Sequence, residues 1–487
     1  MDILLINPFH EQPLLYNFPW GVLSVGSYLT SKGYDVTLLD ASSIPDERFR
    51  AELDAALGKT RLVGIGCFST DVDFVKDIVD HIKARDPGIL VMLGGPHAVL
   101  NSESTAAYPN VDVVVYGYGE EPTEALIEQV RAGRRDFAAV NGILYRENGQ
   151  VVRTAPCTDT KFYDTDFSLL PESRRVLFKK HLQLLAGRGC SFKCAFCYNA
   201  ICGQKWAGRS AEDVVAEIEK CVALYDPDVI YFRDENFFHS KKRIYRFIEL
   251  YKEKGFRFRW EATCRANYFR DSFVNDALLV DLEAVHCAKL KFGIESGSQR
   301  VLDYLKKGTT LNEIRRVVNA LAKVSITGNY SFLMGVPGET RAEYVETVKL
   351  IRYILDVDPH AEIIGPQYYR IYPGGEIYDE IVRDFGIEEP KTFEEWGERS
   401  SKDDFGFGKN IEHPWIREGD WLAKYSDVLV LLYRKQLREL LTPLKCPAIP
   451  FALLAKMRMR LGWFGMLVDI KLAHALFKRY VKVVREG

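Results

Sequence analysis

Apolar runs and amphipathic stretches alternate along the first third of the chain. Five apolar runs have the length of strands, and they cover residues 2–7, 35–40, 62–68, 89–94 and 112–117. Stretches with helical spacing lie between them, for example 22–31 and 73–85. Continuous β-branched runs separated by helices are typical of a parallel sheet that is covered on both faces. Residues 1–140 are therefore predicted to form a doubly wound, Rossmann-like α/β domain.

A second series of alternating strands and helices occupies the middle of the chain. Residues 141–180 are predicted to be a linker with a hairpin, because Asn148-Gly149 is a strong turn signal. Six further strands are expected at 182–186, 229–233, 257–262, 289–294, 327–334 and 363–369. Strands joined by helical crossovers favour a partial (β/α)6 TIM-type barrel over residues 181–375. Residues 376–487 are predicted to be a mostly helical carboxyl-terminal region.

Glycines and small polar residues follow the strands of the first domain. Ligands bind beyond the carboxyl ends of the strands in sheets of this kind. The candidate ligand-binding residues at that edge are Asn7, Ser69, Thr70, Gly94, Gly95, Pro96, His97, Gly117, Gly119 and Glu120. No G-x-G-x-x-G follows the first strand, so a dinucleotide site is not favoured.

Three cysteines with the spacing C-x3-C-x2-C follow the first barrel strand. They are Cys190, Cys194 and Cys197, and three thiolates on one loop can hold one metal centre. A structural zinc site needs a fourth ligand, which Cys202 or a remote residue would have to supply. A disulfide is disfavoured, because the ten cysteines are scattered and the chain starts with a strand rather than an export signal. An iron–sulfur cube on three cysteines would leave one iron open.

Charge and hydrophobic content argue against nucleic acid as a partner and against a membrane-spanning helix. The chain has 487 residues and a formal charge of −2, which does not support a nucleic-acid binder acting through a broad basic surface. No apolar run reaches the roughly twenty residues that a membrane-spanning helix needs. A reducing cytoplasm is the expected compartment.

The cysteine spacing, with Tyr198 directly after the third cysteine, is the signature of the radical SAM enzymes. Together with Gly-Gly-Pro-His at 94–97 and Gly-Tyr-Gly-Glu-Glu-Pro at 117–122, it resembles the B12-binding radical SAM family over residues 1–375. The resemblance implies a 4Fe-4S cluster on the three cysteines, S-adenosylmethionine on its open iron, and cobalamin over the first domain's carboxyl edge. The chain has no D-x-H-x-x-G motif, so His10 and His97 are interpreted as hydrogen-bonding loop residues rather than cobalt ligands.

The resemblance also assigns roles to residues at the ends of the barrel strands. Asp234 or Glu235 would face the ammonium group of S-adenosylmethionine, and Glu295 and Ser296 its ribose or carboxylate. Gly335 and Gly338 would line the adenine. Arg265 is a further cofactor candidate, Tyr369 and Tyr372 are candidate catalytic residues at the substrate, and Cys264 is interpreted as a core residue. Each acidic residue could instead cap a helix or form a surface ion pair.

Three functions remain open. The first is a cobalamin-dependent methyltransferase that acts on an unactivated carbon of a small-molecule or lipid-like substrate through a 5′-deoxyadenosyl radical. The second is a radical SAM cyclase or rearrangement enzyme that retains the B12-binding fold. The third is a non-catalytic electron-transfer protein, which would not need so many polar strand ends. Either enzyme would take single electrons from a reductant such as a flavodoxin or a ferredoxin.

The last segment of the chain differs in charge from the rest. Residues 441–487 contain nine basic and two acidic residues, a net charge of +7, interspersed with large apolar side chains. The favoured interpretation is a helical cap whose apolar face packs on the barrel. The alternative is peripheral contact with an anionic membrane surface, on which such a stretch can lie.

Overall fold

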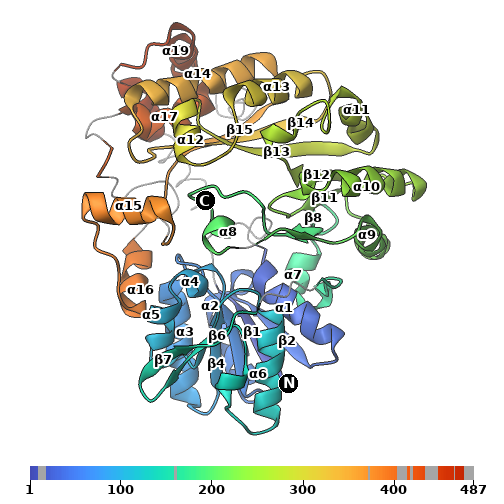
Figure 1. Cartoon of the computed structure of the whole chain (residues 1–487), viewed down its shortest axis with the longest axis vertical. Coiled ribbons are helices and arrows are strands. Elements are labelled where there is room, and N and C mark those ends of the chain that lie inside the picture. Colours follow the sequence, from blue (N-terminus) through green and yellow to red (C-terminus); the bar gives the residue numbers. More distant parts are fainter. Residues whose placement is uncertain are drawn as a thin grey trace. The chain divides into compact units, whose positions relative to one another are not determined.

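The structure is a computed structural model of the chain (Figure 1). It describes residues 1–8, 18–157, 162–203, 205–370, 373–402, 414–416, 421–433, 448–465 and 467–475. The chain divides into two compact units, and each is described by itself. The first consists of Met1–Leu184, Ala216–Asp228 and Ile387–Ile411, and the second of Leu185–Val215, Val229–Gly386 and Glu412–Gly487.

The first unit is built around a seven-stranded sheet. Its strands are β1 (Ile3–Asn7), β2 (Val36–Asp40), β3 (Leu62–Gly66), β4 (Leu90–Gly94), β5 (Val113–Val115), β6 (Ile143–Glu147) and β7 (Gln150–Arg153). Its helices are α1 (Trp20–Ser31), α2 (Asp46–Leu57), α3 (Val72–Arg85), α4 (Pro96–Leu100), α5 (Ser102–Ala107), α6 (Glu120–Arg131), α7 (Glu172–Arg175) and α16 (Phe393–Lys402). The strand order is β2-β1-β3-β4-β5-β6-β7, and β1 to β5 pair in parallel.

This sheet confirms the doubly wound architecture and changes the expected role of the hairpin. Asn148 and Gly149 adopt positive φ angles of 51° and 79°, as the turn signal predicted. The hairpin strand β6 pairs antiparallel with β5, so the hairpin extends the sheet instead of lying in a free linker. Its side chains Ile143 and Leu144 are fully buried, which explains why the hairpin joins this core.

Helix α16 packs in the first unit, although it lies in the predicted carboxyl-terminal region of the chain. Phe393 and Trp396 of this late helix are buried in the core of the first unit, together with residues of α2 and α3. Burying two large aromatic rings stabilises the unit by several kcal/mol, at about 1.5–3 kcal/mol for each ring. No local sequence pattern predicts this packing, because the partner residues in α2 and α3 lie about 300 positions earlier in the chain.

The second unit contains the barrel sheet. Its strands are β11 (Val229–Phe232), β12 (Arg259–Thr263), β13 (Cys287–Glu295), β14 (Thr327–Met334) and β15 (Glu362–Tyr368), and β8 (Leu182–Leu184) joins the sheet beside β11. The short strands β9 (Gly187–Arg188) and β10 (Ala207–Gly208) form a separate antiparallel pair. The helices are α8 (Tyr198–Ile201), α10 (Lys241–Glu253), α11 (Asp276–Ala284), α12 (Gln299–Tyr304), α13 (Leu311–Leu321), α14 (Arg341–Val357), α15 (Glu376–Phe385), α17 (Trp421–Tyr433) and α19 (Ala448–Leu461). Helix α9 (Ala211–Tyr225) begins in the second unit, and its residues from Ala216 onward belong to the first.

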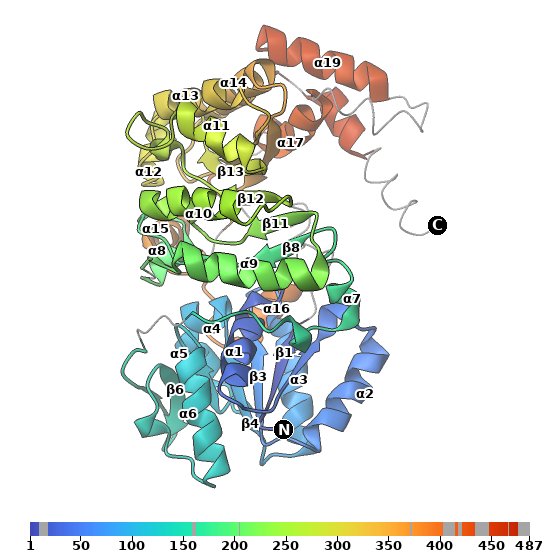
Figure 2. The same cartoon turned by 90° about the vertical axis from the view of Figure 1, so that its right-hand side faces the viewer.

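The barrel sheet is parallel and open, as the sequence predicted. The four pairings from β11 to β15 are parallel, and the sheet order ends in β15 on one side and β8 on the other. Aromatic side chains fix its outer face, where the Trp260 ring lies 5.9 Å from Phe232 and 5.5 Å from Phe247 of α10. Figure 2 shows α10, α11 and α13 along this side.

The carboxyl-terminal helices form their own core against β14 and α14. Leu422 and Leu429 of α17 and Met459 of α19 pack with Met334 and Val348. The expected helical cap on the barrel is therefore present. Among the described residues, no helix is long and apolar enough to cross a membrane.

Candidate active site

The three cysteines lie on the loop between β9 and α8. Cys194 is buried, while Cys190 and Cys197 are half-buried. The backbone N–H of Cys197 donates to the Cys194 carbonyl at 3.1 Å, and that of Ala195 to the Leu305 carbonyl at 3.0 Å. Tyr198 begins helix α8 directly after the third cysteine. The loop is thus tied both to itself and to the end of α12.

Acidic residues after β11 hold the start of this loop. Asp234 Oδ1 accepts the Ala186 N–H at 2.7 Å, and Glu235 Oε2 accepts the Gly189 N–H at 3.0 Å. Arg243 of α10 pairs with Asp234 at 3.3 Å and donates to the Ala186 carbonyl at 2.7 Å. Burial raises the pKa of Asp234 to about 6, against the opposing effect of the Arg243 charge.

These contacts separate the two acidic candidates. Asp234 is 1% exposed, and its carboxylate is engaged by the loop backbone and by Arg243. Asp234 is therefore a positioning residue for the cysteine loop. Glu235 is exposed, so its carboxylate is the one of the two that a ligand can reach. Contact of Glu235 with the ammonium of S-adenosylmethionine stays a prediction.

Two side chains aim hydrogen-bond donors at the cysteine sulfurs. Asn236 Nδ2 lies 3.8 Å from Cys190 Sγ, and Arg265 Nη1 lies 3.7 Å from Cys194 Sγ. The Arg265 guanidinium also stacks on Phe192, 3.6 Å from the ring centroid. Donors in these positions can hydrogen-bond to the sulfurs that would ligate a cluster. The sequence had singled out Arg265 but not Asn236.

The cysteine set fits an iron–sulfur cluster better than a zinc ion. Within the described residues, no three His, Cys, Asp or Glu side chains converge on one metal ion. The ligands of a cluster bind different irons, so they need not converge on one point. The thiols are still close enough to interact, because Cys194 and Cys190 add to burial in raising the pKa of Cys197.

Glu295 at the end of β13 has a strained backbone and a buried partner. Its φ angle is 68°, in the left-handed region that non-glycine residues rarely adopt. Its carboxylate accepts a hydrogen bond from Lys307 Nζ at 2.7 Å, and both side chains are about nine-tenths buried. The Lys307 carbonyl in turn accepts a hydrogen bond from Arg265. Lys307 therefore links the β13 end to the cysteine loop, and the sequence analysis missed it.

Ser296 is held inside the packing between β13 and α14. Its hydroxyl lies 3.1 Å from Thr347 Oγ1, and only 1% of the residue is exposed. The neighbouring Gly297 donates its N–H to the same threonine at 2.9 Å. A Cβ on Gly297 would lie 2.6 Å from the Thr347 Cα, so only glycine fits. A ligand contact by Ser296 stays a prediction, since its hydroxyl already has a protein partner.

The loop between β14 and α14 is shaped by a buried carboxyl group. Gly335 and Gly338 have φ angles of 72° and 71°. Glu339 Oε2 accepts the N–H groups of Gly335 at 2.8 Å and Val336 at 3.1 Å, while its buried Oε1 has no hydrogen-bond partner in the described structure. Burial raises the pKa of Glu339 to about 8.

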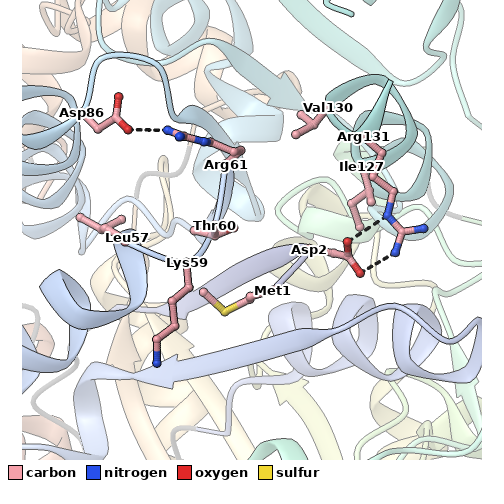
Figure 3. Close-up of a pocket in the computed structure, with 11 residues that line it drawn as sticks. Met1, Asp2, Leu57, Lys59, Thr60, Arg61, Asp86, Ile127, Val130 and Arg131 are labelled. Carbon is pink, nitrogen blue, oxygen red and sulfur yellow. Dashed lines mark hydrogen bonds and ion pairs between the residues drawn. The ribbon is translucent and has the colours of Figure 1, made fainter. Parts of the chain in front are cut away.

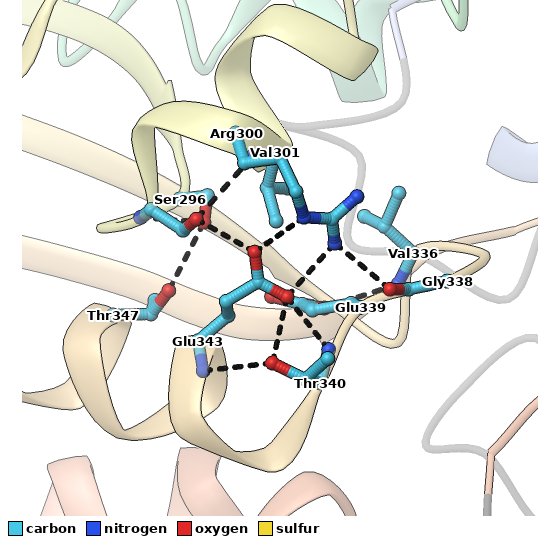
Figure 4. A network of polar contacts seen from close by, with 10 residues as sticks. Ser296, Arg300, Val301, Val336, Gly338, Glu339, Thr340, Glu343 and Thr347 are labelled. Atoms are coloured by element: carbon cyan, nitrogen blue, oxygen red, sulfur yellow. Dashed lines mark hydrogen bonds and ion pairs between the residues drawn. The ribbon is translucent and has the colours of Figure 1, made fainter.

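A polar network fixes the other side of the same loop (Figure 4). Arg300 donates to the Gly338 carbonyl at 2.8 Å and pairs with Glu343 at 2.6 Å. Glu343 and Thr340 form the capping box that starts α14. Arg300 lowers the pKa of Glu343 to about 2, so this carboxylate stays charged.

Of the two tyrosines predicted at the substrate, the structure describes only Tyr369. Tyr369 is buried, and its N–H donates to the Met334 carbonyl at 2.8 Å. Burial raises its pKa above the usual range, so it is a neutral phenol. Tyr372 lies outside the described residues. The role of either tyrosine at the substrate stays a prediction.

The candidate residues of the first unit meet at one edge of its sheet. Asn7 is the last residue of β1, and Ser69 and Thr70 follow the neighbouring β3, on either side of the point where the strand order reverses. Gly95 has a φ of 96°, and a Cβ there would lie 3.0 Å from the Cys67 backbone. Gly94 and Pro96 flank it after β4, while Gly117, Gly119 and Glu120 follow β5.

Several of these side chains already have protein partners. Asn7 donates to Asp40 at 2.8 Å, and Asp40 forms a buried ion pair with Arg174. Glu120 accepts a hydrogen bond from Tyr163 at 2.5 Å. The half-buried Ser69 and the exposed Thr70 remain closest to solvent, beside Phe68, which is 47% exposed.

His97 is completely buried beneath helix α16. Its Nδ1 lies 3.1 Å from Ser69 Oγ and 3.2 Å from Asn101 Nδ2, and its ring lies 5.5 Å from that of Trp396. Burial lowers its pKa to about 3, so the ring is neutral. These contacts agree with a hydrogen-bonding role instead of cobalt ligation. His10 lies outside the described residues.

Cobalamin fits this edge through backbone and hydroxyl contacts. The edge offers the Ser69 and Thr70 hydroxyls, the exposed Phe68 ring and the close glycine backbone at Gly95. A separate cavity of about 540 Å³ lies at the opposite, amino ends of the strands. Figure 3 shows its lining, with Arg131 paired to Asp2 and Arg61 to Asp86. This cavity contains none of the candidate residues.

Comparisons with known proteins identify the same two parts. The model of the radical SAM superfamily matches residues 184–351, and that of the B12-binding domain matches residues 14–127. An uncharacterized methyltransferase of Pyrococcus horikoshii is 29% identical over 78% of this chain and 83% of its own length. The anaerobic magnesium-protoporphyrin IX monomethyl ester cyclase of Rubrivivax gelatinosus is 25% identical over 78% and 70%.

A solved structure has the same fold over most of the chain. It is that of the radical S-adenosylmethionine methyltransferase TsrM from Kitasatospora setae, with tryptophan and an S-adenosylmethionine analogue bound. The TM-score is 0.66 at 19% identity, with 78% of this chain and 76% of that chain covered.

Proposed function

Because the chain belongs to the B12-binding radical SAM enzymes, we propose that it is a cobalamin-dependent methyltransferase that acts on an unactivated carbon. The observation that carries the proposal is the three-cysteine loop with donors aimed at its sulfurs, in a chain with a B12-binding domain. Two of the similar proteins reported above are methyltransferases.

The cofactors supply the difficult chemistry: the cluster provides the electron that cleaves S-adenosylmethionine, and cobalamin provides the methyl group. The chain binds and orients them. Cys190, Cys194 and Cys197 would hold the cluster, and Asp234 and Arg243 keep their loop in place. Glu235 and Glu295 offer carboxylates to S-adenosylmethionine. The buried Tyr369 helps to exclude water near the end of β15.

Product analysis after anaerobic reconstitution tests this proposal. S-adenosylhomocysteine formed together with 5′-deoxyadenosine supports methyl transfer. Deoxyadenosine alone supports the second candidate, a cyclase or rearrangement enzyme, which the similarity to the magnesium-protoporphyrin cyclase favours. A protein that binds no cobalamin even after incubation with it contradicts the methyltransferase proposal.

The single electrons would come from an external protein such as a flavodoxin or a ferredoxin. Radical SAM enzymes need a reductant in general, and the identity of this one is part of the proposal. Purified flavodoxin and ferredoxin systems should each be compared with dithionite for their ability to support cleavage of S-adenosylmethionine. Failure of both proteins, with dithionite active, would contradict this part.

Peripheral contact with an anionic membrane is a further part of the proposal. Residues 453–472 expose large apolar side chains, which include Leu453, Leu461, Trp463 and Leu472 at 57%, 72%, 51% and 53%. Lys456, Arg460 and Lys471 lie among them, whereas Arg458 is buried in an ion pair with Asp469. An apolar surface with basic residues suits anionic lipid headgroups.

Vesicle flotation tests the membrane contact. Wild-type protein should bind vesicles that contain phosphatidylserine and not pure phosphatidylcholine vesicles, and Leu461→Glu should reduce binding. Leu224→Glu is the matched control, since Leu224 is 73% exposed on α9. Equal binding by Leu461→Glu and wild type would contradict the proposed surface.

A further inference from the structure

The inner face of the barrel sheet is lined with charged side chains. Strand residues alternate between faces, and the outer face carries the aromatic core around Trp260. The inner face carries Tyr231 and Arg233 from β11 and its end, Glu261 from β12, Lys289 and Lys291 from β13, Asn329 from β14 and Glu362 from β15. A barrel interior of ordinary type is filled by branched apolar residues, so this composition needs another explanation.

Most of these charges are paired with one another. Lys291 Nζ lies 3.0 Å from Glu261 and 3.4 Å from the centroid of the Tyr231 ring. Lys289 Nζ lies 2.9 Å from Glu362 and 3.8 Å from Glu261. The lysine and glutamate side chains are between 15% and 37% exposed, so water and solutes can reach them.

Arg233 is the cation of this set that lacks a carboxylate. Its guanidinium lies 5.8 Å from the centroid of the Tyr231 ring and 3.4 Å from the tyrosine hydroxyl. No carboxylate lies within ion-pair distance of it in the described structure, and the residue is exposed. The Arg233 charge acts on the neighbouring Glu235 carboxylate without forming an ion pair with it.

The position of Arg233 links it to the candidate active site. It immediately precedes Asp234 and Glu235, which hold the cysteine loop. Tyr231 joins it to Lys291, because the two cations contact the same ring. A guanidinium, an ammonium and a phenol hydroxyl on one face are donors suited to an oxyanion.

We propose that Arg233, together with Lys291 and Tyr231, binds an oxyanion group of the substrate, either a carboxylate or a phosphate. Arg233 supplies a guanidinium that forms no ion pair with the described residues, while Glu261 keeps Lys291 in place. That this ligand is the substrate rests on the proposed function, whereas the anion site itself is inferred from the contacts alone. A substrate with such a group would be polar at the end that enters the barrel.

Anion titration of the full-length protein tests the site without turnover. Inorganic phosphate, followed by the ³¹P line width, and acetate, followed by saturation-transfer difference, represent the two sources of the oxyanion. Arg233→Gln should weaken binding of the preferred anion about tenfold, the loss of one charge-assisted contact. Arg233→Lys should stay within about threefold of wild type, because it keeps the charge. The matched control is Arg270→Gln, an exposed arginine on the loop after β12.

The outcomes distinguish the site from its alternatives. Stronger binding of phosphate than acetate, or the reverse, identifies the source of the oxyanion. Equal anion binding by wild type, Arg233→Gln and Arg270→Gln overturns the proposal. So does an Arg233→Gln variant that loses affinity for S-adenosylmethionine but not for the anions. Failure of the proposed function is separate, since a protein that forms no S-adenosylhomocysteine can still lose anion binding with Arg233.

Thermal unfolding of each variant serves as the folding control. A midpoint for Arg233→Gln within about 2 °C of wild type is expected, because exposed positions rarely affect stability. If Arg233→Gln does not fold, Tyr231→Phe provides the second variant, which removes only the hydroxyl. It should weaken anion binding about threefold, and unchanged binding would then overturn the proposal.

Discussion

The carboxyl edges of the two sheets differ in the hydrogen bonding and the backbone conformation of their polar residues. In the first unit, Asn7 and Ser69 are hydrogen-bonded to protein partners. The barrel edge instead has Glu295 at a φ of 68°, and Glu339 Oε1 and Arg265 Nε have no hydrogen-bond partner among the described residues. The first edge also has one unpaired buried atom, His97 Nε2, but none of its non-glycine candidates has a positive φ angle. Backbone strain in a non-glycine residue is often found at functional sites. The barrel edge is thus the reactive one, and the first edge offers backbone and hydroxyl contacts.

Substitution of a cluster cysteine is expected to have the largest effect on cluster assembly and activity. Cys194→Ala should abolish cluster assembly and S-adenosylmethionine cleavage, because the remaining two thiols cannot hold the cluster. Cys202→Ala, five residues after Cys197 and half-buried, should keep both. Iron content and 5′-deoxyadenosine formation after anaerobic reconstitution measure this. A Cys202→Ala protein that loses its metal would instead support a fourth thiol ligand.

The buried carboxyl of Glu339 should make stability depend on pH. Its folded pKa of about 8 lies above the ordinary glutamate value of 4.5, so folding binds a proton between these pH values and the contribution to stability falls as pH rises through them. The Glu339→Gln variant lacks this titrating carboxyl group. Its stability relative to wild type should rise by about 2–5 kcal/mol between pH 5 and pH 8 and level off above.

Denaturant unfolding of both proteins from pH 5 to pH 9 measures that difference. Because every other titrating group is shared, the difference between the two curves isolates Glu339. Parallel curves over the whole range would show that the Glu339 carboxyl is not buried as described.

Arg265 should tune the cluster by a smaller amount. Its guanidinium lies 3.7 Å from Cys194 Sγ, and hydrogen bonds to cluster sulfurs raise the reduction potential. Arg265→Leu should lower the potential by the equivalent of about 1–2 kcal/mol. Redox titration followed by electron paramagnetic resonance measures this shift, and Arg265→Lys should show less of it. A potential that rises in Arg265→Leu would refute the assigned contact.

The smallest effect is expected at the first edge. Ser69→Ala removes a hydroxyl that already bonds to His97, so cobalamin affinity should fall by only about 0.5–1.5 kcal/mol. Absorbance titration with cobalamin measures it. Thr37→Ala, exposed on β2, is the control. A loss of more than about a hundredfold would mean that this edge depends on Ser69 as strongly as the barrel depends on its cysteines.

Local patterns were sufficient for the strands and for the cysteine loop. Residues 327–334 are predicted as a strand and form β14 with the same bounds, because Tyr330 and Phe332 alternate with Asn329 and Ser331. Glu235 and Arg265 were named because they follow strands, and the carboxyl ends of parallel strands meet at one edge.

Contacts between distant parts of the chain could not be predicted in this way. Lys307 reaches Glu295 through a turn after α12, and Asp234 holds Ala186 across 48 positions. Neither contact could be predicted, because the residues around each position in the sequence do not indicate its distant partner. Burial of His97 under α16 also required the folded chain. Sequence thus indicated which residue types serve the site, and the fold separated those that position the loop from those that can reach a ligand.

The most direct test is the electron paramagnetic resonance spectrum of the reduced, reconstituted protein with and without S-adenosylmethionine. We expect a [4Fe-4S] signal whose g values shift when S-adenosylmethionine is added, because three cysteines leave one iron open to it. A signal that does not change with saturating S-adenosylmethionine would contradict binding at an open iron.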